Sequence, residues 1–300
     1  MIDKLEMFVA LANERHFGRA AERCGVTQPT LSAGIKQLEE TLGVQLVRRG
    51  SRFQGLTPEG ARALDWAQRI VGDARTMRAE LRATREGLAG HLRLAVVPTA
   101  LAMADRLSRP LLARHPGLQM TVHSCTSDEV RARIDGLEAD AGITYLDNEP
   151  LGRLTQVPLY EERYLLLTGA ESDLAGRERI SWAEAAARPL CLLTTDMQNR
   201  RILNQHMADA GAEAAPRLAS NSVLVLAAHV RAGGWETILP HATAELFASD
   251  GRLRALPIVA PEAAHQMGLV AEPREPHSPA LTALIAAARR IGRAAGLIPA

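Results

Sequence analysis

The stretch that decides the fold spans residues 17–60 and reads FGRAAERCGVTQPTLSAGIKQLEETLGVQLVRRGSRFQGLTPEG. Apolar side chains recur in it at helical spacing, which predicts a short helix over 17–24 and a longer one over about 28–42. Gly25 between them is able to take positive φ, so it ends the first helix. Pro29 suits the first turn of the second helix, where a backbone N–H has no intrahelical partner to lose. Two helices joined by a tight turn are therefore expected.

The spacing of small and apolar residues around this turn is typical of a helix-turn-helix. Ala21 is small where two helices cross closely, Gly25 lies in the turn, and Leu31 locks the second helix onto the first. Residues 3–13 also repeat apolar side chains at helical spacing, which predicts a helix before the pair. The sequence therefore predicts a three-helix module in this region.

The outer face of the helix over 28–42 has the composition of a surface that reads DNA. Its polar, uncharged or basic side chains gather at the N-terminal end, which is the end of a recognition helix that reaches base edges in the major groove. The acidic residues Glu39 and Glu40 come only later. The predicted reading residues are Gln28, Pro29, Thr30, Ser32 and Lys36. The alternative is a solvated helix face in a module that binds protein.

A basic hairpin is predicted directly after this helix. Residues 44–47 alternate as a short strand, and residues 53–56 return. The turn between them carries Arg48, Arg49 and Arg52. Such a wing lies along the phosphate backbone or in the adjacent minor groove. Residues 1–93 hold 15 Lys and Arg against 11 Asp and Glu, in a chain whose net charge is +1, so charge also favours a polyanion site here. The alternative is a solvated loop.

Residues 58–90 predict a long helix that needs a partner. Its apolar side chains repeat at intervals of four and three, which is the pattern of a coiled-coil seam. The seam residues are Ala63, Ala67, Ile70, Ala74, Met77, Leu81, Thr84 and Leu88. The simplest partner is the same helix of a second copy, which gives a homodimer. The alternative is that the stripe docks on its own domain.

The remainder of the chain alternates predicted strands and helices. Aliphatic and β-branched runs at 91–97, 118–125 and 141–145 are separated by helical stretches, which implies a parallel sheet with right-handed crossovers. A second such set follows, and the chain is expected to cross between the two sets near 160–164 and 262–268. The sequence therefore predicts an α/β fold with two lobes.

The stretch over 17–60 resembles the N-terminal domain of LysR-type transcriptional regulators. The shared motifs are paired alanines, a Thr-Gln-Pro turn, a following serine, Leu-Glu, Leu-Gly, a basic hairpin and Leu-Thr-x-x-Gly. In this chain they are Ala20-Ala21, Thr27-Gln28-Pro29, Ser32, Leu38-Glu39, Leu42-Gly43, Arg48-Arg49 and Leu56-Thr57-Pro58-Glu59-Gly60. Gly34 departs from the pattern, since the family carries a longer polar residue there. We expect this departure to alter base preference.

The resemblance implies a chain in three parts. They are a winged helix-turn-helix domain over 1–57, a dimerising linker helix over 58–90, and an effector-binding domain over 91–300. That domain would share the architecture of periplasmic binding proteins, with lobe I over 91–161 and 268–300 and lobe II over 162–267. The resemblance also implies a homotetramer that binds and bends a double-stranded DNA operator, and that changes geometry when a small-molecule effector closes the lobes. RNA polymerase is a further candidate partner.

In such folds ligands lie beyond the carboxyl ends of strands and against helix N-termini. Hydroxyl, amide and backbone N–H groups gather at those places, which suits a small anionic effector. The predicted effector residues are Pro98, Thr99, Thr126, Ser127, Thr195, Met197, Gln198, Asn221 and Trp235. The alternative is that each Ser, Thr or Asn simply caps a helix.

Catalytic and redox chemistry find little support in the sequence. The motifs of serine hydrolases, P-loop proteins, dinucleotide-binding folds and zinc proteases are absent, so we expect no enzyme activity, cofactor or metal. A solvated turn at the crossover explains Glu161 and Glu162. An alternative sensor would place Cys125 and Cys191 across the cleft as redox-active thiols. No secretory segment or membrane contact is expected, which favours the cytoplasm.

Overall fold

The computed structural model describes residues 1–48, 50, 53–174 and 176–298. Its contacts divide the chain into two compact units. Unit 1 contains Met1–Gly90 together with Asp135–Glu138 and Arg274–Ala280, and unit 2 contains the other residues. No helix among the described residues is long and apolar enough to cross a membrane.

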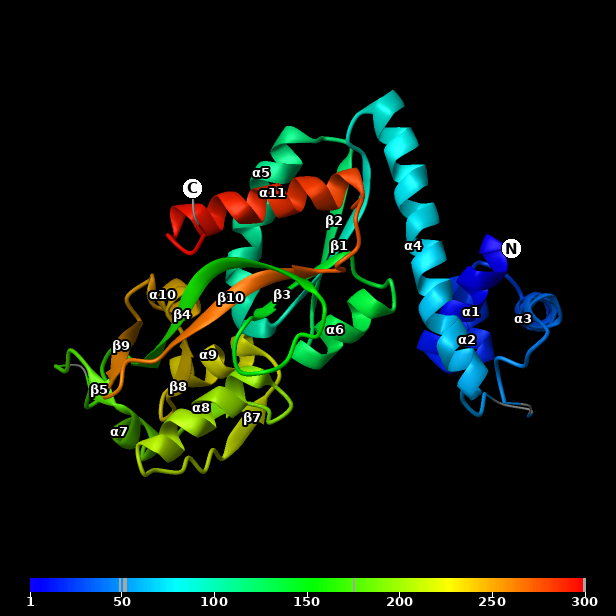
Figure 1. Ribbon diagram of the computed structural model, residues 1–300. Helices are drawn as coiled ribbons and strands as arrows, with labels where there is room; N and C mark the ends of the chain where they lie inside the picture. Colours follow the sequence, from blue (N-terminus) through cyan, green and yellow to red (C-terminus); the bar gives the residue numbers. More distant parts are fainter. Residues whose placement is uncertain (49, 51–52, 175, 299–300) are drawn as a thin grey trace. The chain divides into compact units, whose positions relative to one another are not determined.

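Unit 1 contains the predicted helices (Figure 1). They are α1 (Ile2–Glu14), α2 (Phe17–Arg23), α3 (Gln28–Leu42) and α4 (Pro58–Glu86). Thr27 caps the start of α3 with its side chain, and Gly43 ends the helix at φ 70°. Phe8, Leu11 and Leu31 are fully buried where the first three helices meet. The helix-turn-helix expected from the spacing of residues 17–60 is confirmed.

The described part of the predicted wing is short. Val47 and Leu56 form an isolated antiparallel bridge. Next to it, the backbone N–H of Arg48 donates to the carbonyl of Gly55 at 3.0 Å. The hairpin base is therefore present, whereas no strand is assigned on either side of it in the described residues.

Helix α4 presents two apolar faces instead of one continuous seam. Ala67 and Val71 are fully buried in the core of unit 1. A separate stripe is 42–64% exposed and consists of Trp66, Ile70, Met77 and Leu81. The predicted seam is therefore divided: Ala67 docks on its own unit, as the alternative proposed, and Ile70, Met77 and Leu81 stay exposed.

Unit 2 contains two groups of strands and helices. The strands are β1 (Gly90–Val96), β2 (Leu118–Ser124), β3 (Ala141–Tyr145), β4 (Thr155–Gly169), β5 (Ile180–Ser181), β6 (Cys191–Leu193), β7 (Leu218–Ser220), β8 (Thr237–Pro240), β9 (Leu253–Val259) and β10 (Ala264–Ala271). The helices are the 3-10 helix η1 (Pro98–Met103), α5 (Ala104–Arg114), α6 (Ser127–Asp135), α7 (Trp182–Ala186), α8 (Gln198–Asp209), α9 (Val223–Ala232), α10 (His241–Ala248) and α11 (Pro279–Ala294).

Strands β4 and β10 connect the two groups and run side by side (Figure 1). Strand β4 pairs with β10 as far as Arg163 and then, from Tyr164 to Gly169, with β8 and β9. The order in the large sheet is β2-β1-β3-β10-β4-β9-β5. Pairs β1–β3 and β5–β9 are parallel, but β10 is antiparallel to both β3 and β4. The prediction of a parallel sheet is wrong in its middle, because the crossing strands run back through it.

Three elements of the second group were not predicted from the sequence: the short strand β5, β9 and α10. Strand β9 contains Pro257, and a proline inside a strand-like run argues against a strand because it lacks a donor for the ladder. Pro257 lies opposite Leu165 at the limit of the β4–β9 register. Its position at the end of the pairing explains why the strand tolerates it.

Candidate DNA-reading face and ligand cavity

The N-terminal end of α3 presents the predicted reading residues to solvent. All five of these residues are exposed, namely Gln28, Pro29, Thr30, Ser32 and Lys36. The opposite face of the helix carries Leu31, Ile35 and Leu38, which are buried against α1 and α2. The apolar face anchors the helix and leaves the polar face free, which is the arrangement that major-groove docking requires.

Two local contacts set the chemistry of this face. The hydroxyls of Thr27 and Thr30 lie 2.9 Å apart, and the Thr27 hydroxyl also accepts from the Thr30 N–H at 3.4 Å. The Lys36 ammonium lies 3.9 Å from the Glu40 carboxylate, with both side chains more than 60% exposed. An exposed pair of this kind contributes about 0–1 kcal/mol, so Lys36 remains able to exchange Glu40 for a phosphate.

Gly34 and Glu39 have structural roles within α3. Gly34 is buried, and a Cβ on it would lie 2.7 Å from the Met7 sulfur of α1. Gly34 therefore faces α1 and not the reading face, so the structure gives no support to the expectation that it alters base preference. The Glu39 carboxylate accepts from the N–H groups of Leu46 at 2.7 Å and Val47 at 3.1 Å. These two bonds fix the base of the hairpin. They also hold the Glu39 carboxylate at the hairpin and away from the reading residues.

Of the three predicted wing arginines, the described one is Arg48. Its side chain is exposed beside the Val47–Leu56 bridge. Arg49 and Arg52 lie outside the described residues. The described hairpin base therefore carries one exposed cation next to the reading helix.

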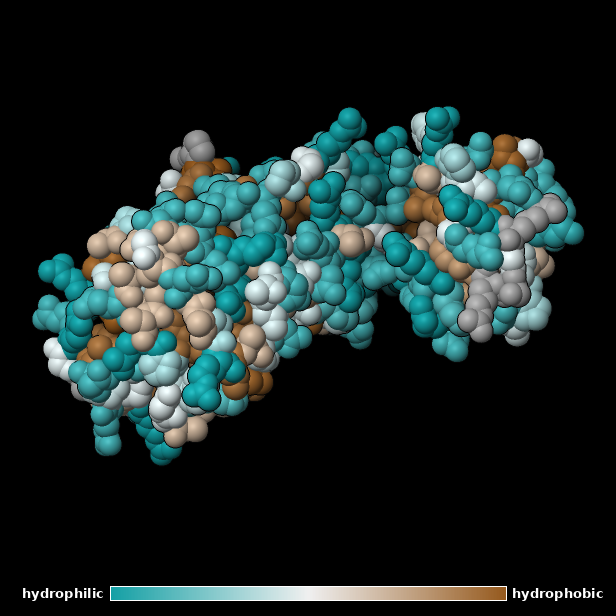
Figure 2. Space-filling view, turned by 90° about the horizontal axis from the view of Figure 1, so that it is seen from below, coloured by the Kyte–Doolittle hydropathy of each residue, from teal (hydrophilic) through white to brown (hydrophobic). Residues whose placement is uncertain are grey.

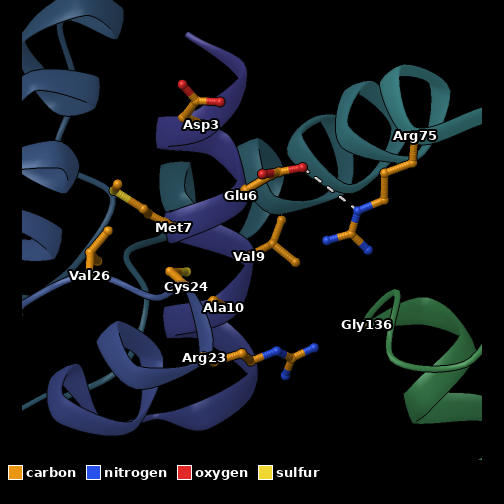
Figure 3. A pocket seen from close by; sticks show the side chains of 10 residues that line it. All are labelled: Asp3, Glu6, Met7, Val9, Ala10, Arg23, Cys24, Val26, Arg75 and Gly136. Carbon is orange, nitrogen blue, oxygen red and sulfur yellow. Dashed lines mark ion pairs between the residues drawn. The ribbon is translucent and has the colours of Figure 1, made fainter. Parts of the chain in front are cut away.

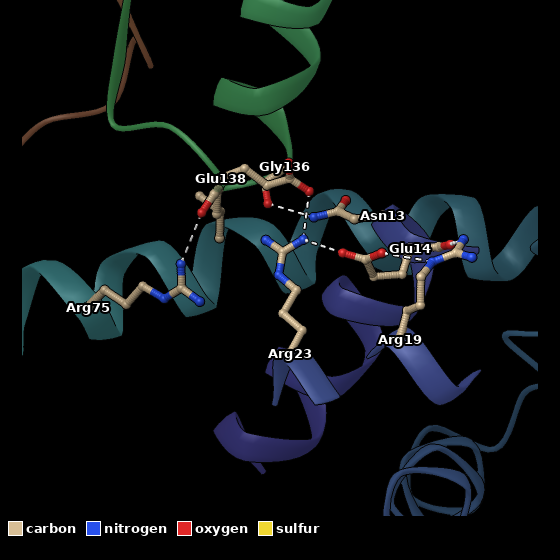
Figure 4. Close-up of polar contacts among 8 residues, drawn as sticks. Asn13, Glu14, Arg19, Arg23, Arg75, Gly136 and Glu138 are labelled. Atoms are coloured by element: carbon tan, nitrogen blue, oxygen red, sulfur yellow. Dashed lines mark hydrogen bonds and ion pairs between the residues drawn. The ribbon is translucent and has the colours of Figure 1, made fainter. Parts of the chain in front are cut away.

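Other contacts of unit 1 lie away from these residues. The segment Asp135–Glu138 contacts α1 and α2 (Figure 4), where the Asn13 amide donates to the Gly136 carbonyl at 2.8 Å. The Arg23 guanidinium pairs with Glu138 at 2.6 Å. Beside them is a hollow of about 450 Å³, whose wall contains Glu6 and Arg75 (Figure 3). None of the reading residues lines this hollow.

Unit 2 contains a small cavity where several predicted effector residues meet. Its volume is about 10 Å³, room for roughly one water molecule. Five of the predicted residues line it, namely Pro98, Thr99, Ser127, Met197 and Gln198. Helix α6 begins at Ser127 and α8 begins at Gln198, so two helix N-termini meet at one place. The positive ends of both helix dipoles favour negative charge there.

The other four predicted effector residues do not line this cavity. Thr126 directly precedes α6 and caps it, because its hydroxyl accepts from the Glu129 N–H at 3.2 Å. Thr195 and Asn221 are exposed. Trp235 lines a different hollow, near Gly233 and Gly234, and its ring meets His229 edge-on at 6.3 Å. For Thr126 the helix-cap alternative describes its observed role.

A wider hollow of about 460 Å³ adjoins the small cavity. The two share Ser127 and Gln198. Arg131 and Arg201 line the wider hollow, and Arg201 pairs with Glu149 at 2.6 Å. Asp128 and Glu149 line the same hollow, so its two guanidinium groups are balanced by two carboxylates, and the two helix N-termini remain as the source of positive potential.

Sequence reasoning missed the back wall of the cavity, which is formed by Tyr145 and Asn199. The Asn199 amide donates to the Tyr145 hydroxyl at 3.1 Å, and the Thr99 hydroxyl lies 3.4 Å from the same oxygen. Tyr145 in turn donates to Glu162, which is fully buried. The expectation of a solvated turn is wrong, because Glu161 and Glu162 both lie within strand β4. The strand directs alternate residues to opposite faces, so Glu161 is exposed and Glu162 is buried. The sequence held one signal for this wall: Tyr145 places a polar hydroxyl at the end of the buried strand β3.

The chain has three thiols, and burial raises the pKa of each. This holds for Cys24 and Cys125, and burial raises the pKa of Cys191 to about 11. The Cys191 thiol is fully buried, and its one S–H has two carbonyl acceptors in reach, Leu226 at 3.7 Å and Glu236 at 3.5 Å. Reactive cysteines require a lowered pKa and access to solvent, so the redox alternative for Cys125 and Cys191 lacks physical support. No group of three or more His, Cys, Asp or Glu residues among those described is arranged to hold a metal ion.

Known proteins share this arrangement. Residues 2–61 match the family described as bacterial regulatory helix-turn-helix protein, lysR family, and residues 85–292 match the LysR substrate binding domain. The DNA-binding transcriptional dual regulator OxyR of Escherichia coli (strain K12) is 31% identical over 276 residues, 92% of this chain and 90% of that protein. A probable hydrogen peroxide-inducible genes activator of Mycobacterium avium is 32% identical over 269 residues, 89% of this chain and 86% of that protein. A full-length OxyR variant from Pseudomonas aeruginosa has a TM-score of 0.75 at 26% identity, over 96% of this chain and 94% of that one.

Proposed function

The chain belongs to the LysR family of DNA-binding transcriptional regulators, and we propose that it reads its operator through the N-terminal end of α3. Gln28, Thr30 and Ser32 contact base edges, while Lys36 and the wing arginines Arg48, Arg49 and Arg52 contact phosphates. The observation that carries this proposal is the exposed polar end of a helix whose other face is buried in its own unit.

Selection from a pool of random duplexes tests the proposal. The full chain is expected to enrich a partly symmetric sequence, because two reading heads of a dimer meet two half-sites. A mobility shift on the enriched duplex then measures its affinity against a scrambled duplex of equal length. Equal affinity for both duplexes would contradict sequence-specific reading.

We propose that the division 1–57, 58–90 and 91–300 is functional and that the linker region joins two copies. The exposed stripe of α4 supports a homodimer, since apolar residues at heptad spacing need a partner helix. Further exposed apolar side chains occur on α9 and α10, at Leu224, Val225 and Leu246. Groups of apolar residues interrupt the mainly hydrophilic surface in Figure 2. These exposed apolar residues support a second interface, through which two dimers associate into a homotetramer.

We propose that a small anionic effector binds at the cavity lined by Thr99, Ser127 and Gln198. Two helix N-termini support the preference for negative charge. At about 10 Å³ the cavity holds roughly one water, so a larger effector requires the lobes to separate. Lobe movement then shifts the equilibrium between oligomer geometries. RNA polymerase is the partner we propose for the DNA-bound form, in the cytoplasm, and we propose no catalytic activity.

Peroxide sensing is a second candidate, because several relatives are named as peroxide-inducible activators. The raised pKa values of all three thiols argue against it. We expect peroxide to leave operator binding unchanged and to form no disulfide between Cys125 and Cys191. Mass spectrometry of the peroxide-treated chain measures the second outcome. A disulfide that forms together with a change in operator affinity would support peroxide sensing.

A further inference from the structure

Glu162 lies on β4, the strand shared by the two groups of unit 2, and its side chain is fully buried. One carboxyl oxygen accepts from the Tyr145 hydroxyl. The other carboxyl oxygen has no hydrogen-bond partner, and no ion pair involves Glu162 in the described part of the chain. A buried carboxylate without a cation is strongly disfavoured relative to the neutral acid.

The surroundings of Glu162 contain a second orphaned acceptor. Asn199 donates its amide N–H to Tyr145, and its carbonyl oxygen is buried without a partner. The side chains of Asn199 and Tyr164 are both within hydrogen-bonding reach of Glu162, and the Tyr164 hydroxyl is also buried without a partner. A proton on the free oxygen of Glu162 removes the unpaired buried charge and supplies a donor for a neighbouring acceptor such as the Asn199 carbonyl oxygen, because a carboxylic acid donates where a carboxylate only accepts.

We propose that Glu162 is a buried proton switch that determines the hydrogen-bonding face of the effector cavity. In the protonated form Glu162 donates to Asn199, Asn199 donates to Tyr145, and Tyr145 donates to Glu162. All three members of this ring are satisfied and the ring is uncharged. On ionisation the proton leaves to solvent and Glu162 only accepts. The second N–H of the Asn199 amide then donates to the carboxylate, and the Asn199 carbonyl oxygen loses its donor. Asn199 and Tyr145 both line the cavity, so the change reaches its wall.

The other titratable groups around Glu162 do not supply a compensating cation. The pKa of Glu162 is raised to about 8. Burial is the main cause, hydrogen bonds with Tyr145, Tyr164 and Asn199 act against it, and Asp147 contributes a smaller rise. Tyr160 and Tyr164 on the same strand have raised pKa values. None of these neighbours is a cation, and burial leaves the neutral acid as the stable form at neutral pH.

Two histidines also lie close to this network, on α8 and β10. His265 is opposite Glu162 in the β4–β10 register, and it lies 3.1 Å from the Asp147 carboxylate and 2.8 Å from His206. The pKa of His206 is lowered, first by burial and then by His265. Its titration therefore falls on the acid side, separate from that of Glu162.

The proposal deepens the proposed effector site and rests on it for its consequence. With Glu162 neutral, the cavity tolerates an anion between the two helix N-termini. With Glu162 ionised, a negative charge behind Tyr145 repels the same anion, so effector affinity falls as pH rises through about 8.

Infrared difference spectroscopy of the full chain tests the switch without any effector. We compare the parent with Glu162→Gln and follow the carbonyl band of a protonated carboxylic acid from pH 6 to 9.5. The parent is expected to show the band at pH 6.5 and to lose it with a midpoint near pH 8, and Glu162→Gln is expected to lack it. A parent without the band at pH 6.5, or with a midpoint below pH 7, would overturn the proposal.

Tyr145→Phe provides an independent variant in case Glu162→Gln does not fold. Its Glu162 loses a donor that favours the ionised form, so the midpoint is expected to rise. A midpoint that stays or falls contradicts the proposed ring. Operator binding is measured on the same samples. If the parent binds no duplex specifically, the proposed function is contradicted, whereas the infrared titration tests the proton switch independently of that result.

Discussion

At the scale of single residues, burial assigns roles that residue type does not reveal. Glu39 and Glu162 are both acidic, but Glu39 accepts two backbone N–H groups of the hairpin and Glu162 holds a tyrosine behind a cavity. Gly34 is a further case, because its lack of a side chain allows Met7 of α1 to pack directly against α3. The sequence predicts where polar residues occur along the chain, but only the packed fold shows which of them water can reach.

Gly60 is a position where a single methyl group is expected to destabilise the fold. A Cβ there would overlap the backbone carbonyl of Leu46, and a backbone group cannot swing away as a long side chain can. Gly60→Ala is therefore expected to lower the free energy of unfolding by about 1–3 kcal/mol. Urea denaturation measures the change. The matched control is Gly169→Ala, because a Cβ at Gly169 meets nothing within 4 Å. Equal stability of the two variants would refute this close approach.

The pKa of Glu162 gives stability a defined dependence on pH. Burial holds the pKa at about 8 in the folded chain, against roughly 4.3 in an unfolded one. The folded state therefore binds the proton more tightly, and the stabilisation is fully present below about pH 4 and is lost as pH rises through about 8. Unfolding measured at pH 6 and pH 9 is expected to show a larger loss for the parent than for Glu162→Gln. Identical losses in both proteins would indicate that Glu162 is already ionised at pH 6.

At the scale of elements, helices were predicted best where their signals are local. The turn at Gly25 and the proline in the first turn of α3 are local signals of this kind, and both occur where expected. Helix α4 was predicted as an element, but its apolar repeat was assigned to one seam. The structure divides those residues between a buried face and an exposed face. A repeat of apolar residues does not identify the surface that covers each face, because that surface lies elsewhere in the chain or in another copy.

The exposed stripe of α4 is expected to join two copies. Leu81→Glu replaces one of the two most exposed members of that stripe with a charge, so the dimer is expected to dissociate into monomers at micromolar concentration. Sedimentation velocity measures the mass. Arg82→Glu is the control, because Arg82 is exposed and lies outside the stripe. If both variants sediment as the parent does, the stripe is not the dimer contact.

At the scale of the whole molecule, the two-lobed architecture of unit 2 was predictable and its sheet topology was not. Alternating strands and helices indicated an α/β fold, whereas the antiparallel return of β10 beside β4 depends on pairing over about a hundred residues of chain. The cavity shows the same division. Thr99, Ser127 and Gln198 were found because they lie in the first turn of a helix that follows a strand, where ligands are expected. Tyr145 was missed because it ends a strand, and Asn199 because the prediction reached only the first residue of α8.

The measurement that tests the central claim most directly compares two variants of the reading head on specific and scrambled duplexes over a series of salt concentrations. Gln28→Ala is expected to cost about 1–3 kcal/mol on the specific duplex alone. Arg48→Ala is expected to weaken binding to both duplexes and to reduce the salt slope by about 1, while the exposed Arg217→Ala in unit 2 leaves both unchanged. If Gln28→Ala binds every duplex with the affinity and salt slope of the parent, α3 does not read DNA and the account is contradicted.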